Sequence, residues 1–412
     1  MAHRSRLSPV DTWAVTIAAP EAPRTRHSVL AVAALFLVNG ATFSNWLPRL
    51  PEIRDHLGIN NAGLGATLLG GGLGGIVGSL LVARAMDRWG SRRLLIGAAT
   101  SLSIGMPVIA VAPIAPLLLV LLLALGTLDV CNDVAMNAQG VTVQQQLGRP
   151  IMNRLHAMWS LGFTGGAVLG SIASAARIDI RWHLAIVGAV LLATVLVVQR
   201  WLVPVDPPVV PAAEPTEHAN GATRGAPLRA TSPAMIAMAF AALAAVALEV
   251  LPNDWAAVLM RDVFSAGRFS GLGTVACAGA MLVGRLSGDH VLERVGERRL
   301  LYGALWVVAA GTIITVAAPV AAVAFLGLMV WGLGLSVVFP QLYATAARLP
   351  GTSAGAGLGS MLLGQRMGAM LTAVCTGALA EARNLRFAFA VVAVVAFTVL
   401  SITLKKAAAA AR

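Results

Sequence analysis

Four ionisable residues of this sequence lie inside long apolar stretches: Asp129, Asp133, Glu249 and Arg366. Placing such a residue at the centre of a membrane helix costs about 2.5–3.5 kcal/mol, so each is a functional candidate. Asp129 and Asp133 are four residues apart and share one face of a helix. Two carboxylates so placed cannot both ionise cheaply, and we expect them to titrate as a coupled pair. The pair predicts proton binding and release; a structural pair satisfied by neighbouring polar groups is the alternative.

Arg366 lies near the middle of the apolar stretch 355–380, beside Gln365. Its guanidinium has no short route to water from that depth, so it needs a partner inside the protein. We expect it to pair with an intramembrane acid, and binding of an anionic substrate is the alternative. The sequence leaves open which acid is the partner.

The elements that must position these residues are membrane-spanning helices. A spanning helix needs about 20 mostly apolar residues. The sequence contains twelve such stretches, at 28–48, 61–82, 94–112, 116–138, 156–176, 183–202, 232–254, 267–287, 300–318, 320–346, 355–380 and 386–404. The composition agrees, because 58% of the residues are hydrophobic and only 12% are charged, against about 25% charged in soluble domains. Soluble and disordered chains are therefore excluded.

The net charge of +12 records topology rather than a binding surface. A nucleic-acid partner would need a basic aqueous surface, and we expect none. Sorted by predicted side, 21 Lys and Arg lie on the side of the termini and 8 on the opposite side. Cytoplasmic segments carry the excess of Lys and Arg. We therefore expect a multi-pass protein of the inner cell membrane with both termini in the cytoplasm.

The chain is organised as two halves that repeat each other. The segment Gly90-x-Arg92-Arg93-Leu94-Leu95-x-Gly97-Ala98 matches Gly296-x-Arg298-Arg299-Leu300-Leu301-x-Gly303-Ala304, and Trp46 matches Trp255. A proline-rich polar segment, 203–231, separates six apolar stretches from six. We expect a cytoplasmic tail (1–27), a six-helix bundle (28–202), a cytoplasmic linker (203–231), a second bundle (232–404) and a tail (405–412). Two six-helix halves about an axis are a transporter architecture.

The loop after the second apolar stretch carries a known signature. Asp87, Arg88, Gly90, Arg92 and Arg93 resemble the G-x-x-x-D-R/K-x-G-R/K-R/K loop of the major facilitator superfamily, although Ala83 replaces its first glycine. The resemblance implies an all-α integral membrane fold, with twelve transmembrane helices in two pseudo-symmetric bundles. It also implies that these five residues latch the two halves together on the cytoplasmic side in one transport state. Anchoring by positive charge is the alternative role for the two last arginines.

A second resemblance narrows the branch. Asp133-Val134-Ala135-Met136-Asn137 is similar to the Glu-x-x-x-Asn segment of fucose permeases, and the stretch through His156 is closer to MosC-like transporters. These are sugar–proton symporters or their neighbours, so the resemblance implies that Asp133 is the first proton-coupling residue and Asp129 the second. It also implies that helices 1, 4, 7 and 10 line the cavity. The substrate contacts expected there, with Arg366, are Asn39, Asn45, Trp46, Asn137, Glu249 and Gln341.

The leading hypothesis is a secondary transporter that moves a small polar solute, sugar-like or polyol-like, with protons. It would act as a monomer in the lipid bilayer, without a cofactor or metal. An exporter of amphipathic compounds is the alternative, because fold does not set function. An enzyme is disfavoured, since the seven histidines are scattered and form no cluster with Cys or carboxylates at ligand spacing. A sensor that binds without transport is not excluded by the sequence.

Overall fold

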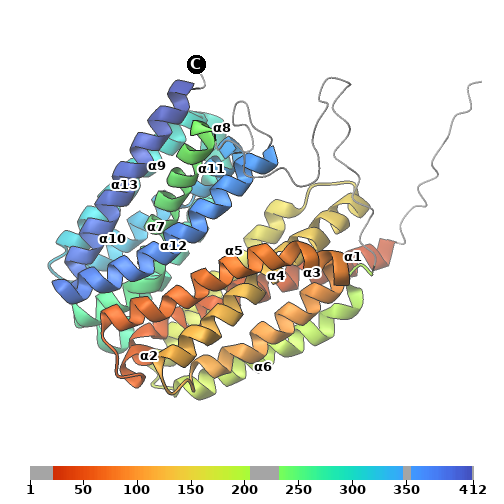
Figure 1. The fold of residues 1–412 in the computed structure, drawn as a ribbon, viewed down its shortest axis with the longest axis horizontal. Coiled ribbons are helices and arrows are strands. Elements are labelled where there is room, and N and C mark those ends of the chain that lie inside the picture. Colours follow the sequence, from red (N-terminus) through yellow and green to blue (C-terminus); the bar gives the residue numbers. More distant parts are fainter. Residues whose placement is uncertain (1–21, 205–231, 347–353, 411–412) are drawn as a thin grey trace, which may run out of the picture.

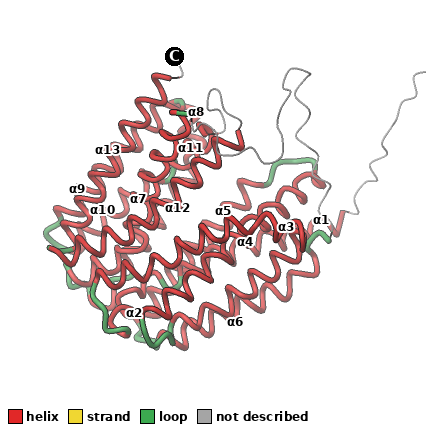
Figure 2. Tube along the Cα trace, viewed as in Figure 1, coloured by secondary structure: helices red, strands yellow, loops and turns green. Residues whose placement is uncertain are grey.

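A computed structural model describes residues 22–204, 232–346 and 354–410. Most of the predicted N-terminal tail (1–27), nearly all of the linker (203–231) and the last two residues of the predicted C-terminal tail (405–412) lie outside the described residues. In the described part, every regular element is a helix, which confirms the predicted fold class (Figure 2).

The helices of the described ranges divide into two halves in chain order. The N-terminal half comprises α1 (Ala22–Ser44), η1 (Leu47–Arg49), α2 (Leu50–His56), α3 (Asn61–Ile109), α4 (Ala115–Leu147), α5 (Met152–Ala175), α6 (Ile180–Val198) and η2 (Gln199–Trp201). The C-terminal half comprises α7 (Pro233–Asp262), η3 (Gly267–Phe269), α8 (Leu272–Val295), α9 (Glu297–Ala317), α10 (Ala321–Leu335), α11 (Val338–Ala346), α12 (Ala354–Ala382) and α13 (Leu385–Ala410).

These elements cross a membrane twelve times, as the sequence predicts. Nine segments of the described residues are both long and apolar enough to span. One of them, α3, has 49 residues and is therefore about 74 Å long, enough for two crossings of a core of about 30 Å. The helices α5 and α12, with 24 and 29 residues, supply the remaining two crossings.

The repeat between the halves extends to backbone conformation. Gly90, at the kink within α3, has φ 71° and ψ 164°. Gly296, between α8 and α9, has φ 79° and ψ 157°. Only glycine adopts such angles without strain, so the same residue makes the same turn in both halves.

Two helices at the chain ends are longer than predicted. The first begins at Ala22 rather than near residue 28, and Pro23 suits its first turn because the missing N–H needs no partner there. The last continues to Ala410 rather than ending near residue 404. Its final residues are alanines, which have the highest intrinsic helix propensity. Both helices therefore continue into polar residues beyond the apolar stretch from which their bounds were predicted.

The two halves form two bundles that meet at one end of the molecule (Figure 1). We call the end of the molecule at α2 the clasp end, after ion pairs that are described with the site below. We call the opposite end, where α1 begins and α13 ends, the tail end. The bundles diverge towards the tail end in Figure 1. Between α3 and α12 the backbones approach closely: a Cβ on Gly65 would lie 2.3 Å from the carbonyl oxygen of Ala373, and one on Gly377 would lie 2.4 Å from that of Asn61. The absence of side chains here lets the two bundles touch.

Candidate functional site

The α4 carboxylates face the interior of the N-terminal bundle and its boundary with the other bundle. Asn39 of α1 donates from Nδ2 to Oδ1 of Asp129 at 3.1 Å. The indole Nε1–H of Trp159, on α5, donates to Oδ1 of Asn39 at 2.7 Å. Three helices are therefore connected by one hydrogen-bonded chain that ends on a carboxylate, and each donor orients the next group in the chain.

Asp133 lies one turn further towards the tail end. Its carboxylate accepts a hydrogen bond of 3.1 Å from Nδ2 of Asn137, four residues later in α4. His156 of α5, in the same bundle, and Arg366 of α12, in the second bundle, both act on it electrostatically. Asp133 is nevertheless exposed. Solvent therefore reaches the space between the bundles from the tail end.

Arg366 lies across the boundary from the two aspartates. A Cβ on Gly75 of α3 would lie 3.1 Å from both Cδ and Nη1 of Arg366, so this glycine makes room for the guanidinium. Its charge acts on Asp129 and on Asp133. It forms no direct ion pair with them, so both acids are its partners through space.

A second charged pair lies deeper between the bundles. Arg285 of α8 approaches Glu249 of α7, with 3.6 Å between Nη2 and Oε1. Its Nη1 donates to Oγ of Ser160, on α5 of the other bundle, at 3.1 Å. Arg285 is one of the 21 Lys and Arg that sorting by predicted side placed with the termini, but it lies between the bundles because it contacts Glu249 and Ser160. The signal was available, since residue 285 falls inside the predicted stretch 267–287.

A cavity of about 280 Å³ lies beyond these pairs, between the two bundles. Both bundles line it: Phe43, Trp46, Leu47, Leu68, Gly71, Gly72, Leu122 and Phe163 from one, and Glu249, Val250, Asn253, Asp254, Ala369, Met370 and Ala373 from the other. Trp46 and Glu249 lie where the sequence predicts substrate contacts. Asp254, which the sequence analysis did not single out, belongs to the interior of α7 and also lines the cavity.

Other predicted contacts lie elsewhere. Asn45 is fully buried against Gly166 of α5, and its Nδ2 donates to the carbonyl of Ala41 at 2.7 Å. Gln341 is buried in α11 and is not among the residues that line the cavity. Asn39 and Asn137 contact the aspartates instead of lining this cavity. Periodicity places a residue on a helix face but does not say which neighbour covers it.

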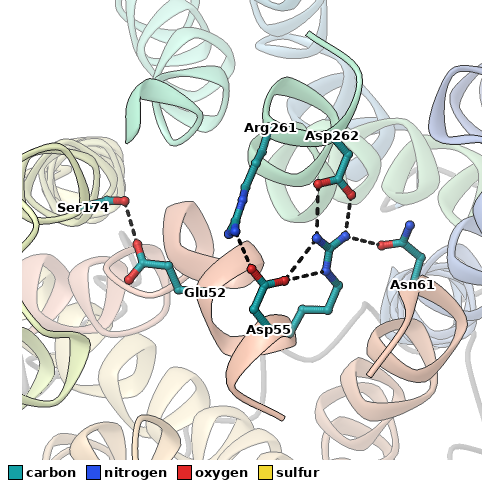
Figure 3. Close-up of polar contacts among 7 residues, drawn as sticks. Glu52, Asp55, Asn61, Ser174, Arg261 and Asp262 are labelled. Carbon is teal, nitrogen blue, oxygen red and sulfur yellow. Dashed lines mark hydrogen bonds and ion pairs between the residues drawn. The ribbon is translucent and has the colours of Figure 1, made fainter. Parts of the chain in front are cut away.

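The clasp end is closed by two reciprocal ion pairs between the bundles, drawn in Figure 3. Arg54 of α2 binds Asp262 at the end of α7, with 3.1 Å between Nη2 and Oδ1, and Arg261 binds Asp55. We call these four residues the clasp. An Arg-Asp dipeptide lies in the last turn of both α2 and α7, and each arginine binds the aspartate of the other bundle. Arg54 also donates to Oδ1 of Asn61 at 2.8 Å.

The predicted latch motif lies at the tail end, and within the described residues it forms no hydrogen bond or ion pair with the other bundle. Asp87, Arg88 and Arg93 are exposed. Arg92 donates from Nη2 to the carbonyl of Gln199 at 3.2 Å, which ties α3 to η2 within the N-terminal bundle. With the clasp formed and the latch motif unbridged, the structure is closed at one end and accessible at the other.

Comparison with known proteins gives a consistent result. The sequence profile of the Major Facilitator Superfamily matches residues 32–355. The chain is 27% identical to the uncharacterized transporter y4wD of Sinorhizobium fredii, over 88% of this chain and 93% of that protein. It is 26% identical to the membrane protein MosC of Rhizobium meliloti, over 91% and 90% of the two chains.

Solved structures share the fold at lower sequence identity. A mutant of the nucleoside transporter NupG superposes with a TM-score of 0.71 at 14% identity, over 93% of this chain and 99% of that one. A bacterial homologue of the human lysosomal transporter Spinster, in an inward-facing and occupied conformation, superposes with a TM-score of 0.69 at 14% identity, over 93% and 97%. At this identity the likeness concerns the fold alone.

Proposed function

Since this chain belongs to the Major Facilitator Superfamily, and is a multi-pass membrane transporter rather than an enzyme, we propose that it is a proton-coupled symporter of a small polar solute. It works by alternating access, in which the two bundles rock about a central site. The observation that carries the proposal is the group of charges between the bundles, in which Arg366 of one bundle acts electrostatically on Asp129 and Asp133 of the other.

The orientation in the membrane follows from the distribution of positive charge. The excess of Lys and Arg on the side of the termini supports a cytoplasmic location of both ends in the inner membrane. In that orientation the tail end faces the cytoplasm and the clasp closes the outer side. The structure then corresponds to the state that is open to the cytoplasm. The cavity forms within one chain, which supports function as a monomer.

Asp133 is the primary proton site because solvent reaches it while Arg366 faces it. A protonated Asp133 attracts Arg366 less strongly, so proton binding weakens one attraction between the bundles. Protonation thereby changes the relative stability of the two states, which is what coupling requires. Asp129, held by Asn39 and one turn away, is the second site.

The solute contacts proposed for this state are Trp46, Glu249 and the polar groups beside Asp133. The alternative function is export of amphipathic compounds. The cavity favours it in one respect, because Phe43, Trp46 and Phe163 give it an aromatic lining. Accumulation of a sugar or polyol in proteoliposomes with an imposed proton gradient, against extrusion of an amphipathic dye, separates the two functions.

The coupling test is Asp133→Asn in proteoliposomes, with a solute chosen by thermal stabilisation of the purified protein from a panel of sugars and polyols. Asparagine keeps the shape but holds no titratable proton. We expect proton-driven accumulation to be lost while exchange of labelled for unlabelled solute continues. Glu381→Gln, an exposed carboxylate of α12, is the matched control. Accumulation that survives in Asp133→Asn refutes the assignment, and saturable binding without any flux identifies a sensor.

A further inference from the structure

The wall of the cavity formed by α7 carries two carboxylates with different surroundings. Glu249, Val250, Asn253 and Asp254 line it together, because positions three and four apart lie on the same side of a helix. Arg285 lies 3.6 Å from Glu249 and offsets its charge. Asp254 has no hydrogen bond or ion pair with any residue that the structure describes. An uncompensated carboxylate in a half-buried position is costly unless something else pairs with it.

A second polar group at the same wall also lacks a partner. Asn253 is only 8% exposed, and its side-chain Oδ1 accepts no hydrogen bond within the described residues. The unused groups at this place are therefore a carboxylate and a carbonyl oxygen, both acceptors. A ligand that completes them must bring donors or positive charge.

The opposite wall is suited to the same ligand. Phe43, Trp46 and Phe163 line the cavity from the N-terminal bundle, with 6.4 Å between the ring centroids of Phe43 and Trp46. Aromatic faces attract cations, and most strongly where water is excluded. No Lys or Arg is among the lining residues, although the molecule as a whole is strongly basic.

We propose that the transported solute carries a cationic ammonium group, and that Asp254 binds this group within the cavity. The inference rests on the proposed transport function and names its substrate class. The ammonium group lies between the carboxylate of Asp254 and the aromatic faces, and a hydrogen-bond donor elsewhere on the solute, such as a hydroxyl group, reaches Oδ1 of Asn253. Glu249 is the weaker of the two acids for this purpose, because Arg285 already offsets its charge.

The test uses choline, whose charge does not depend on pH, and its uncharged isostere in which a tert-butyl group replaces trimethylammonium. Thermal unfolding of the purified full-length chain is recorded against the concentration of each compound, since a ligand that binds the folded state raises Tm. We expect choline to stabilise the wild-type chain and the isostere to do so at least about tenfold more weakly. Asp254→Asn should weaken choline binding about tenfold or more, and Glu381→Gln should not.

Three results would each overturn the inference: no stabilisation by choline, equal stabilisation by the isostere, or undiminished choline binding in Asp254→Asn. Sodium chloride at matched concentration is measured as a further control. If it raises Tm as much as choline does, the site binds an inorganic cation and the inference is overturned. The readout is binding, so it is independent of flux. A chain that transports a neutral polyol but ignores choline contradicts only this inference, and one that binds choline without any flux contradicts only the proposed function.

Discussion

Arg285 determines how Glu249 is accommodated between the bundles. Both side chains are largely buried, at 26% and 19% exposed, and the arginine also binds Ser160 of the other bundle. An arginine in this place has two roles at once, since it offsets the charge of an acid and connects α8 to α5. Neither role requires the cytoplasmic location that its sequence position suggests.

Removing this arginine should destabilise the chain more than removing both members of the pair. We expect Arg285→Gln to cost about 1–3 kcal/mol, because Glu249 is left without its counter-charge. The double variant Arg285→Gln with Glu249→Gln should recover most of the loss, as two amides can bond to each other. Thermal or denaturant unfolding of the purified proteins measures both. Equal losses in the single and double variants would show that the two charges are not coupled.

At the scale of single elements, Pro252 interrupts the backbone hydrogen bonds of α7. Proline has no N–H, so the carbonyl of Leu248, four residues earlier, lacks its helical donor. Trp331 of α10 supplies one, with its Nε1–H 3.1 Å from that oxygen. This is how a helix interrupted by proline remains satisfied where water is absent. The interruption falls between Glu249 and Asp254, the two acids of the cavity wall.

A double-mutant cycle tests this account of α7. Trp331→Phe should cost about 1–3 kcal/mol in the wild-type background, because the carbonyl of Leu248 is left unsatisfied. In a Pro252→Ala background the new N–H at position 252 bonds to that carbonyl, so the same substitution should cost about 1 kcal/mol less. The loss of packing against Phe389 is common to both backgrounds and cancels. Additive effects, measured by thermal unfolding, would contradict the exchange of donors.

At the scale of the whole molecule, the clasp selects which end is closed. Its two pairs join α2 to α7 and are both within reach of solvent, with Asp55 45% and Arg261 34% exposed in one pair and Asp262 27% and Arg54 13% exposed in the other. Surface pairs contribute about 0.2–1 kcal/mol each and weaken as salt increases. That is too little to lock the molecule and enough to bias a two-state equilibrium. An interaction of this size suits a gate that opens in every cycle.

Breaking the clasp should populate the state that is open at its end. In Arg54→Gln with Arg261→Gln we expect the ratio of open to closed molecules to rise roughly two- to thirtyfold, the equivalent of two weak pairs. Spin labels at His56→Cys and Ser265→Cys, in a Cys375→Ala background, report the distance between the bundles by pulsed electron resonance. In the clasp variant a population with a longer distance between the labels should appear. In the labelled chain that keeps the clasp, added salt should increase the share of molecules with this longer distance.

The matched control is Arg181→Gln, an exposed arginine that is not part of the clasp. It should leave the distance distribution unchanged. If the clasp variant behaves like this control, the ion pairs do not contribute to closure, and the glycine contacts between α3 and α12 are sufficient to hold that end together.

By itself the sequence determined the number of membrane crossings, the all-helical fold and the family. Those properties depend on local quantities, namely the length of apolar stretches and the residues of one loop. It also identified Asp129, Asp133, Glu249 and Arg366, because a charge in an apolar stretch is visible without any neighbour. The kink at Gly90 and its repeat at Gly296 were readable for the same reason, since only glycine makes that turn freely.

Only the tertiary structure decided which charges meet. Arg285 and Asp254 lie at the ends of predicted apolar stretches, but α8 and α7 extend past them, and both residues lie between the bundles. Asn45 is a polar residue at the end of a helix expected to line the cavity, but α5 covers it because Gly166 has no side chain there. The clasp joins positions 206 and 208 residues apart. Pairing across such separations depends on how two bundles pack, and that is set by many contacts at once rather than by any local pattern.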